Sequence, residues 1–321
     1  MIIMDTRDTQ HTQEVKETRR PAAKRKGGAH GRRNSQSFFA LFLSNLKSDK
    51  LALFGVILLI FFIFVGIFSD SLAPHGPRDR HYTEDRQIRR LEPPSWAHPF
   101  GTTDVGRDIF SQVILGTRTA LLVGFLAALL VTFVGSVLGI ISGYFGGVVD
   151  TILMRIVDFF YAIPFIPFVI VLAAVLKPSI WNVILAVSLL SWRTVARIVR
   201  SQVLSISKRP YIKAAKVAGA GHKRIMFKYI LPNVVPLVLL EMAFMVNWAI
   251  MAEASIAFLG FGDPQVTSWG QILHINFVSG YSRVAWWWTV PPGLAIVLLL
   301  VSIFFVARSL EAVVDPRLRK R

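Results

Sequence analysis

The sequence contains no cysteine in its 321 residues, and acidic side chains are scarce. Without cysteine, disulfide bonds and thiolate metal sites are excluded. The patterns G-x-x-x-x-G-K-[ST], H-E-x-x-H and G-x-S-x-G are also absent, and the seven histidines are scattered along the chain. Those patterns mark phosphate-binding loops, zinc hydrolases and serine nucleophiles. We therefore expect no catalytic residue, no directly bound cofactor and no metal ligand in this chain.

Long apolar runs are what the sequence has instead. Hydrophobic residues make up 53% of the chain, and several runs approach the ~20 residues that a bilayer-spanning helix needs. The fourth run is the weakest, because Arg193 lies at its end, and the first begins too late to be a cleaved signal peptide. We expect an all-α integral membrane protein with six transmembrane helices, at Leu51 to Phe68, Ala120 to Ser142, Ile152 to Leu176, Val183 to Ser191, Ile230 to Phe258, and Trp286 to Ala307.

The positive charge predicts the orientation of these spans. Of the 36 lysine and arginine residues, 27 fall on segments that six spans would place on one side, which we expect to be cytoplasmic. The stretch from Arg193 to Lys228 carries no acidic residue, whereas seven cations between Ser69 and Arg118 are balanced by seven acidic residues. Both termini are therefore expected on the cytoplasmic side of the cell membrane. Topology and attraction to anionic lipid would explain the charge, and nucleic-acid binding is disfavoured because the cations flank the spans.

The chain is expected to divide into six segments. These are a disordered basic cytoplasmic tail at 1–34, an amphipathic interfacial helix at 35–50, the first transmembrane helix at 51–68, an extracytoplasmic segment at 69–118, a five-helix core at 119–307, and a basic cytoplasmic tail at 308–321. In the extracytoplasmic segment, Asp104 and Asp108 could bind a metal, but Arg107 lies between them and no histidine stands at ligand spacing. Helix caps and turns are their favoured use.

Small residues and prolines predict how two of the spans pack and bend. Gly135, Gly139 and Gly143 recur every fourth residue, so this face of the second span is expected to pack closely on another helix. Pro164 and Pro167 interrupt the third span and favour a bend, either static or a moving hinge.

Three carboxylates at membrane depth are candidate residues of a translocation path or gate, together with Pro164. We expect Asp158 to reach the surface or pair with Arg155, Glu253 to be partly hydrated, and Glu241 to be the most buried. A proton relay through these groups is the main alternative mechanism.

A basic segment between the fourth and fifth spans predicts two short cytoplasmic helices. Ser207 could cap the first helix, with Pro210 in its first turn, and a second helix could start near His222 and end at Lys228. Glycine tolerates positive φ, so Gly219-Ala220-Gly221 supplies a turn. Three alanines form a smooth stripe on the first helix, flanked by lysines: Ala214, Ala215 and Ala218, with Lys213 and Lys216.

This segment resembles the "EAA" loop of permease subunits of bacterial and archaeal ATP-binding-cassette importers. The matching residues are Ala214, Ala215, Gly219, Ile230, Leu231 and Pro232, and Lys213 replaces the glutamate of the motif. Further blocks are similar to the C-type permease of dipeptide and oligopeptide importers, the binding-protein-dependent transport system inner membrane components: "FGTTDVGRDIFSQVILGTRTALLVG", "GYFGGVVDTILMRIVD", "AEASIAFLGFGDP" and "VVDPRLR". The sequence "VARSLEAVVDPRLR" departs from the family by lacking a G-D-x-L-R-D run.

The resemblance implies a peptide importer driven by ATP. Its partners would be a homologous B-type permease subunit, two ATPase subunits that hold ATP and Mg, an extracytoplasmic solute-binding protein, and membrane lipid. A coupling loop at 207–228 would transmit ATPase movement to the spans, through Lys213, Ala214, Ala215, Ala218, Gly219, Gly221, Ile230, Leu231 and Pro232. The cargo could also be an oligosaccharide, nickel or another small solute, and more remote alternatives are a proton-coupled secondary carrier or a scaffolding protein.

Overall fold

The computed structural model describes residues 49–82 and 85–314. The expected basic tail at 1–34 and nearly all of the interfacial helix at 35–50 lie outside the described residues, as does the end of the carboxyl-terminal tail.

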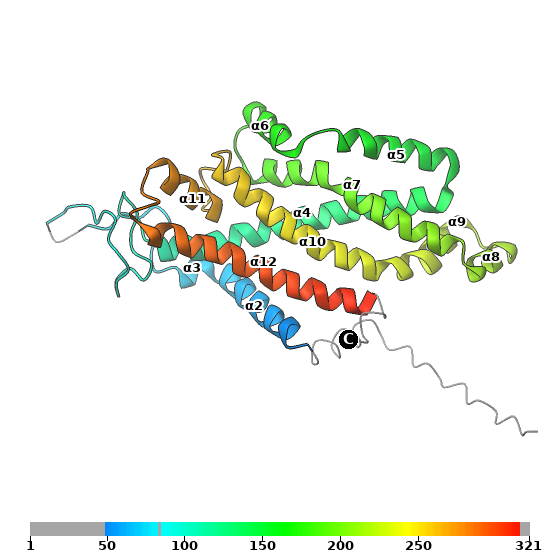
Figure 1. The fold of residues 1–321 in the computed structure, drawn as a ribbon, viewed down its shortest axis with the longest axis horizontal. Helices are drawn as coiled ribbons and strands as arrows, with labels where there is room; N and C mark the ends of the chain where they lie inside the picture. Colours follow the sequence, from blue (N-terminus) through cyan, green and yellow to red (C-terminus); the bar gives the residue numbers. More distant parts are fainter. Residues whose placement is uncertain (1–48, 83–84, 315–321) are drawn as a thin grey trace, which may run out of the picture. The chain divides into compact units, whose positions relative to one another are not determined.

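The described residues form helices joined by loops, with no strand among them (Figure 1). Asp49 caps the first of these helices by accepting hydrogen bonds from the backbone N–H groups of Leu51 and Ala52. The elements are α2 (Lys50–Ile67), α3 (Ser69–Leu72), α4 (Ile109–Phe145), α5 (Gly147–Tyr161), α6 (Phe165–Val175), α7 (Ile180–Ser207), α8 (Pro210–Val217), α9 (His222–Ile225), the π-helix η1 (Met226–Ile230), α10 (Leu231–Phe258), α11 (Trp269–Val278) and α12 (Trp286–Val314).

Five of the described helices are long and apolar enough to cross a membrane: α2, α4, α7, the continuous run of α9, η1 and α10, and α12. The bent pair of α5 and α6 would make a sixth span. The fourth span is longer than the sequence suggests, because α7 continues through Arg193 to Ser207. The fold is therefore all-helical with five or six spans.

The third span is not one helix. α5 and α6 meet at 75°, and Pro164 stands between them with an extended backbone, at φ −71° and ψ 131°. The proline ring disfavours a helical conformation of the preceding residue and its nitrogen donates no hydrogen bond, which favours a break in the helix at this point. Pro167 lies in the first turn of α6, where few backbone donors are needed.

The glycine-rich face of α4 packs directly against α7. A Cβ atom on Gly135, Gly139 or Gly143 would lie 2.7–2.8 Å from the backbone carbonyl oxygen of Trp192, Ala196 or Arg200, respectively. Only glycine permits this approach, because any side chain would meet backbone rather than a movable side chain. Figure 1 shows α4 and α7 lying side by side, with α10 against α4 and with α12 between α10 and α2.

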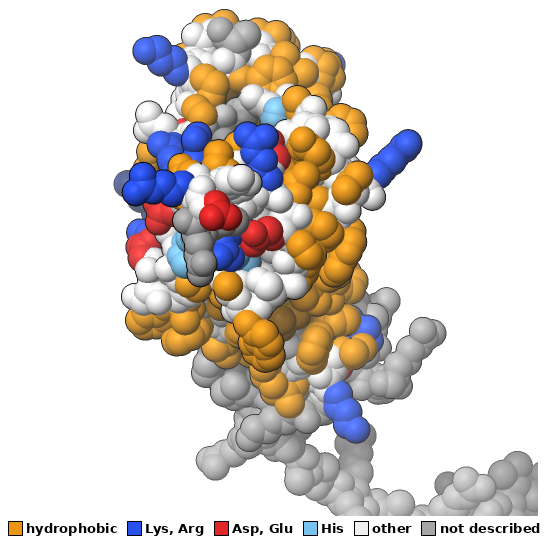
Figure 2. All heavy atoms as spheres, turned by 90° about the vertical axis from the view of Figure 1, so that its left-hand side faces the viewer, with side chains coloured by type: hydrophobic (Ala, Val, Ile, Leu, Met, Phe, Trp, Pro, Cys, Tyr) orange, Lys and Arg blue, Asp and Glu red, His pale blue; other side chains and the backbone are white. Residues whose placement is uncertain are grey.

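The segment between α3 and α4 forms a small lobe held by backbone hydrogen bonds and two isolated bridges, Tyr82 with Ile88 and Thr102 with Asp108. Figure 2 shows acidic, basic and histidine side chains gathered on the face where this lobe lies. Asp108 is the buried N-cap of α4, and Asp104 lies in the turn before it. Asp108 therefore has the helix-cap role that the sequence favours.

Candidate functional site

The basic segment after α7 forms a short helix and a tight turn. α8 begins at Pro210, and its N-cap is Arg209. The expectation that Ser207 caps this helix is wrong, because Ser207 is the last residue of α7. After α8, Gly219 adopts a φ of +78°, the left-handed conformation that commonly ends a helix. Gly221 has a φ of −66°, so its backbone conformation does not require glycine.

The second basic helix is part of a membrane span. α9, η1 and α10 run without interruption from His222 to Phe258, a length of 37 residues. The expected end of this helix at Lys228 is therefore not observed, since that residue lies inside the π-helical turn. Leu231 and Pro232 are the first two residues of α10. The second basic helix and the fifth span are therefore one element.

A buried anchor fixes α8 to the bundle. The side chain of Ile212 is fully buried, and it shares a cluster with Val203 and Ile206 of α7. Ile225 and Ile230 from the following helix complete this cluster, so Ile230 is a core residue and not a surface contact. A displacement of α8 would therefore also displace side chains of α7 and of the helix that leads into α10, because they are packed in the same cluster.

The opposite side of α8 is open. Val217 is 90% exposed, and the neighbouring side chains on this surface are also exposed: Lys213, Ala214, Lys216, Ala218 and Gly219, with Ala215 half-buried. This surface consists of one exposed valine and small side chains, flanked by exposed lysines, so it is smooth enough to fit closely against another protein. We call this surface, formed by Lys213, Ala214, Lys216, Val217, Ala218 and Gly219, the docking face.

A hydrogen bond ties the end of α4 to the same segment. The hydroxyl of Tyr144 lies 2.8 Å from Nδ1 of His222, and the ammonium of Lys216 lies 5.1 Å from the centre of the Tyr144 ring. Tyr144 is buried, whereas His222 and Lys216 are exposed, so this contact lies at the edge of the bundle. α4, α8 and α9 are thus joined at one point beneath the docking face.

α5 is fastened to α7 by two ion pairs. Arg200 donates to both carboxylate oxygens of Asp150, at 2.5 and 2.6 Å, and Ser142 of α4 donates to the same carboxylate. The second pair joins Arg197 to Asp158 at 2.8 Å. The expected pairing of Asp158 with Arg155 is therefore wrong.

Tyr161 strengthens this α5–α7 contact at the end of α5. The guanidinium groups of Arg193 and Arg197 lie over its ring, with their central carbons 4.8 Å and 4.4 Å from the ring centre, respectively. The Tyr161 hydroxyl also lies 3.2 Å from the hydroxyl of Thr194. Stacking on an aromatic ring helps a charged side chain to lie on an apolar helix, which explains how α7 continues past Arg193.

Both carboxylates of α10 are buried. Glu241 is 8% exposed and Glu253 is 6% exposed, so the expectations of a partly hydrated Glu253 and of Glu241 as the most buried carboxylate are both wrong. Glu253 borders a small pocket with Thr119, Ser268 and Asp263. Neither glutamate forms an ion pair with any residue in the described ranges. The structure does not bring them together with Asp158, whose side chain is about half exposed on the α5–α7 contact.

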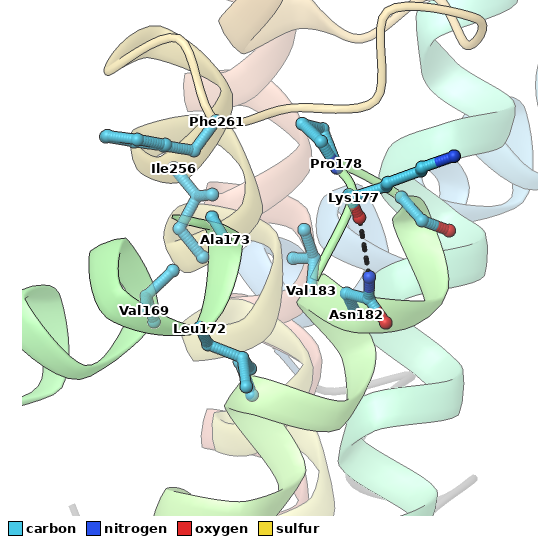
Figure 3. Close-up of a pocket in the computed structure, with 11 residues that line it drawn as sticks. Val169, Leu172, Ala173, Lys177, Pro178, Asn182, Val183, Ile256 and Phe261 are labelled. Atoms are coloured by element: carbon cyan, nitrogen blue, oxygen red, sulfur yellow. Dashed lines mark hydrogen bonds between the residues drawn. The ribbon is translucent and has the colours of Figure 1, made fainter. Parts of the chain in front are cut away.

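The bend between α5 and α6 borders an open apolar hollow of about 330 Å³, lined by Pro164, Phe165, Pro167, Trp248 and Met251, among others. The Phe165 ring packs on the Trp248 ring at 5.4 Å, and the Trp248 indole N–H donates to Ser191 at 3.0 Å. Figure 3 shows the junction beyond this hollow, where α6 packs against α7 and α10 through Val169, Val183 and Ile256. Three helices thus meet around Pro164.

The Asp150–Arg200 pair is the feature of this site that sequence reasoning missed. The two residues are 50 positions apart, so no local spacing indicates the pairing. The "GYFGGVVD" block, which ends at Asp150, was the available signal.

Comparison with known proteins assigns the chain to a family. The family described as binding-protein-dependent transport system inner membrane component matches residues 135–320, more than half of the chain. This chain belongs to that family. A second family description, the N-terminal TM domain of oligopeptide transport permease C, matches residues 37–94. The protein is therefore a multi-pass membrane permease component of the ATP-binding-cassette importer class.

Several named proteins are similar to the permease over most of its length. The dipeptide transport system permease protein of Haemophilus influenzae is 35% identical over 281 residues, which cover 85% of this chain and 93% of that protein. The dipeptide transport system permease protein of Escherichia coli K12 is 37% identical over 281 residues, with 85% and 91% covered. The oligopeptide transport system permease protein of Bacillus subtilis is 34% identical over 302 residues, with 94% and 97% covered.

A solved structure shares the fold of the permease. A chain of the MetNI methionine ABC transporter, in an inward-facing conformation, matches with a TM-score of 0.53 and 19% sequence identity. The match covers 63% of this chain and 96% of that chain. The matched part of the helical arrangement is therefore one that a chain of an ABC transporter is known to adopt.

Proposed function

We propose that this permease imports dipeptides or oligopeptides, paired with a homologous B-type permease chain above two ATPase subunits. In this proposal the ATPases bind ATP and Mg²⁺, and an extracytoplasmic binding protein delivers the peptide. The names of the relatives at 34–37% identity support the cargo. The docking face, exposed on a helix whose other side is buried in the bundle, is the observation that carries the coupling role.

Coupling follows from how α8 is held. ATPase closure would displace the docking face, and Ile212 and the Tyr144–His222 contact would pass the displacement to α7 and α4. The unbroken helix from His222 would pass it to α10. A partner shifts the equilibrium between two conformations only when it binds them with different affinity. The ATPases must therefore bind the docking face more tightly in one of the two permease conformations than in the other.

The same proposal sets the orientation. The docking face, both chain termini and the cation-rich end of α7 lie in the cytoplasm, and the lobe between α3 and α4 lies outside. Lys213 is exposed at the position where the family motif has glutamate. The ATPase contact there is therefore made with a cation, and an acidic ATPase residue would complement it.

Two glycines offer a matched test. A Cβ atom added to Gly219 or to Gly221 would meet no neighbouring atom within 4 Å, but only Gly219 has positive φ. Gly219→Val therefore strains the turn, by about 1–2 kcal/mol, without creating a clash. Gly221→Val makes the same chemical change without that strain.

The experiment reconstitutes the complete importer in lipid vesicles and measures peptide uptake together with cargo-stimulated ATP hydrolysis. We expect Gly219→Val to lower both about 5–30-fold, which is the factor that 1–2 kcal/mol produces, and Gly221→Val to leave them near wild type. Unchanged coupling in Gly219→Val would overturn the role of the loop. Labelled peptides, oligosaccharides and nickel offered to the wild-type importer decide the cargo independently.

A further inference from the structure

The lobe between α3 and α4 brings together three histidines that are far apart in sequence. The ring centres of His75 and His81 are 4.1 Å apart, those of His81 and His98 are 4.7 Å apart, and those of His75 and His98 are 5.6 Å apart. One nitrogen from each ring can be chosen so that all three lie within 4.8 Å of one another. These three residues, scattered along the sequence, therefore lie together in the folded lobe.

Asp108 positions two of the three. Its Oδ1 atom lies 3.0 Å from Nδ1 of the buried His98, which fixes that ring and leaves Nε2 as the nitrogen available to a ligand. Its Oδ2 atom accepts hydrogen bonds from the backbone N–H and the hydroxyl of Ser111, at 2.8 and 2.6 Å. The Ser111 hydroxyl oxygen in turn accepts the backbone N–H of His75 at 3.1 Å.

The third histidine is held by its backbone and has an unused nitrogen. The His81 N–H donates to the carbonyl of Gly106, and the His81 carbonyl accepts the N–H of Arg89. The Nε2 atom of His81 is buried and has no hydrogen-bond partner among the described residues. A buried polar atom without a partner is costly, and an absent ligand is one of its ordinary explanations.

We propose that His75, His81 and His98 bind a divalent transition-metal ion of the zinc type. Imidazole nitrogen is a preferred ligand of zinc, copper and nickel, and three histidines with one open position make a known zinc geometry. Tetrahedral zinc with bonds of about 2.0–2.1 Å places its ligand nitrogens about 3.4 Å apart. Small rotations of the rings, starting within 4.8 Å, bring the three nitrogens to that spacing.

The electrostatics of the cluster favour metal binding. The carboxylate of Asp108 contacts His98 from behind, and a carboxylate in that place raises the basicity of a histidine ligand.

The ion would clamp the lobe. Its ligands come from three points: just after α3, beside the Tyr82–Ile88 bridge, and ten residues before the N-cap of α4. Between these points the described part of the lobe has no helix or ladder of strands. A metal that joins them would fix the lobe on the end of α4, independently of which cargo the importer carries.

The test uses the full-length chain, purified in detergent through a tag without histidine, stripped with chelator and titrated with zinc chloride. We expect one zinc ion per chain by mass spectrometry of the metal, and at least a hundredfold weaker binding in His75→Ala and in His81→Ala. His274→Ala is the matched control, because His274 of α11 contacts the Phe258 carbonyl and lies outside the cluster. It should bind zinc as the wild type does, and zinc should raise the melting temperature of both.

The double variant His75→Ala/His81→Ala decides the proposal, since it keeps every other histidine. Zinc held at wild-type affinity by this variant, or no zinc bound by the folded wild type, would overturn the site. Cobalt in place of zinc adds a visible absorption band of a four-coordinate ion, which the double variant should lack. If an alanine variant shows no melting transition, glutamine at the same position replaces it and the same outcomes apply.

Discussion

Arg200 of α7 holds Asp150 of α5 through two parallel hydrogen bonds, while Ser142 of α4 donates to the same carboxylate. The helices α4, α5 and α7 therefore meet at one carboxylate, next to the last glycine of the α4–α7 contact. The side chains of this pair are only 17% and 27% exposed, whereas those of the neighbouring Asp158–Arg197 pair are 52% and 49% exposed.

We expect the two pairs to contribute very differently to stability. Asp150→Ala should lower the free energy of unfolding by about 1.5–3 kcal/mol, the range for hydrogen bonds to charged groups, because it leaves Arg200 half-buried and unpaired. Asp158→Ala, the matched control on the same helix, should cost less than about 1 kcal/mol, because water screens an exposed pair. Thermal unfolding of the detergent-solubilised chain measures both, and equal melting temperatures would contradict the difference.

Alanine substitutions at two glycines, one in α4 and one in α12, should change the free energy of unfolding in opposite directions. Gly139→Ala places its Cβ 2.7 Å from the Ala196 carbonyl oxygen, and such overpacking costs about 1–3 kcal/mol. Gly293→Ala in α12 meets no atom within 4 Å and should stabilise the helix by about 0.4–1 kcal/mol. The melting temperatures should therefore move in opposite directions. A neutral Gly139→Ala would show that α4 and α7 can separate at no cost.

The two sides of α8 should separate stability from partner binding. Ile212→Ala opens a cavity in a fully buried position and should cost about 2–5 kcal/mol, felt mainly where α8 meets α7. Val217→Asp changes a side chain that is 90% exposed, so stability should change by no more than about 0.5 kcal/mol. Co-purification of the ATPase subunits should nevertheless fail with Val217→Asp, because a carboxylate enters an apolar contact. Retention of the ATPases by this variant would remove the docking face from the coupling role.

Glu241 distinguishes an ATP-driven importer from a proton-coupled carrier. With the energy supplied by the ATPases, Glu241→Gln should change peptide uptake by no more than about twofold, equivalent to ~0.4 kcal/mol. The purified chain alone, under a pH gradient, should show no uptake. Gradient-driven uptake that Glu241→Gln abolishes would favour the carrier, and vesicle transport assays with and without ATP measure each case.

Local patterns predicted the parts of the fold that depend on local chemistry. Glycine at every fourth residue is a property of one helix, and the face formed by Gly135, Gly139 and Gly143 lies against α7. Proline at 164 removes a donor wherever the helix lies, and the chain bends there by 75°. The positive φ of Gly219 follows equally from a turn between two helices.

Partners distant in sequence could not be predicted in this way. The nearest cation to Asp158 in sequence is Arg155, but α7 brings Arg197 closer in space. Similarly, His75, His81 and His98 have no metal-site spacing, because the lobe joins them by folding back on itself. The helix α7 is longer than its apolar run indicates, because the Tyr161 ring accommodates the charge of Arg193 beyond the end of that run.

The continuity of α9, η1 and α10 has a mechanical consequence. At about 1.5 Å per residue, a helix of 37 residues is a rod about 55 Å long. Tilting such a rod by about 10° around one end sweeps the other end through about 10 Å, comparable with the diameter of a helix. A small tilt of the helix about its basic end can therefore open a gap wide enough for a peptide at the far end, without any change in the internal structure of the helix.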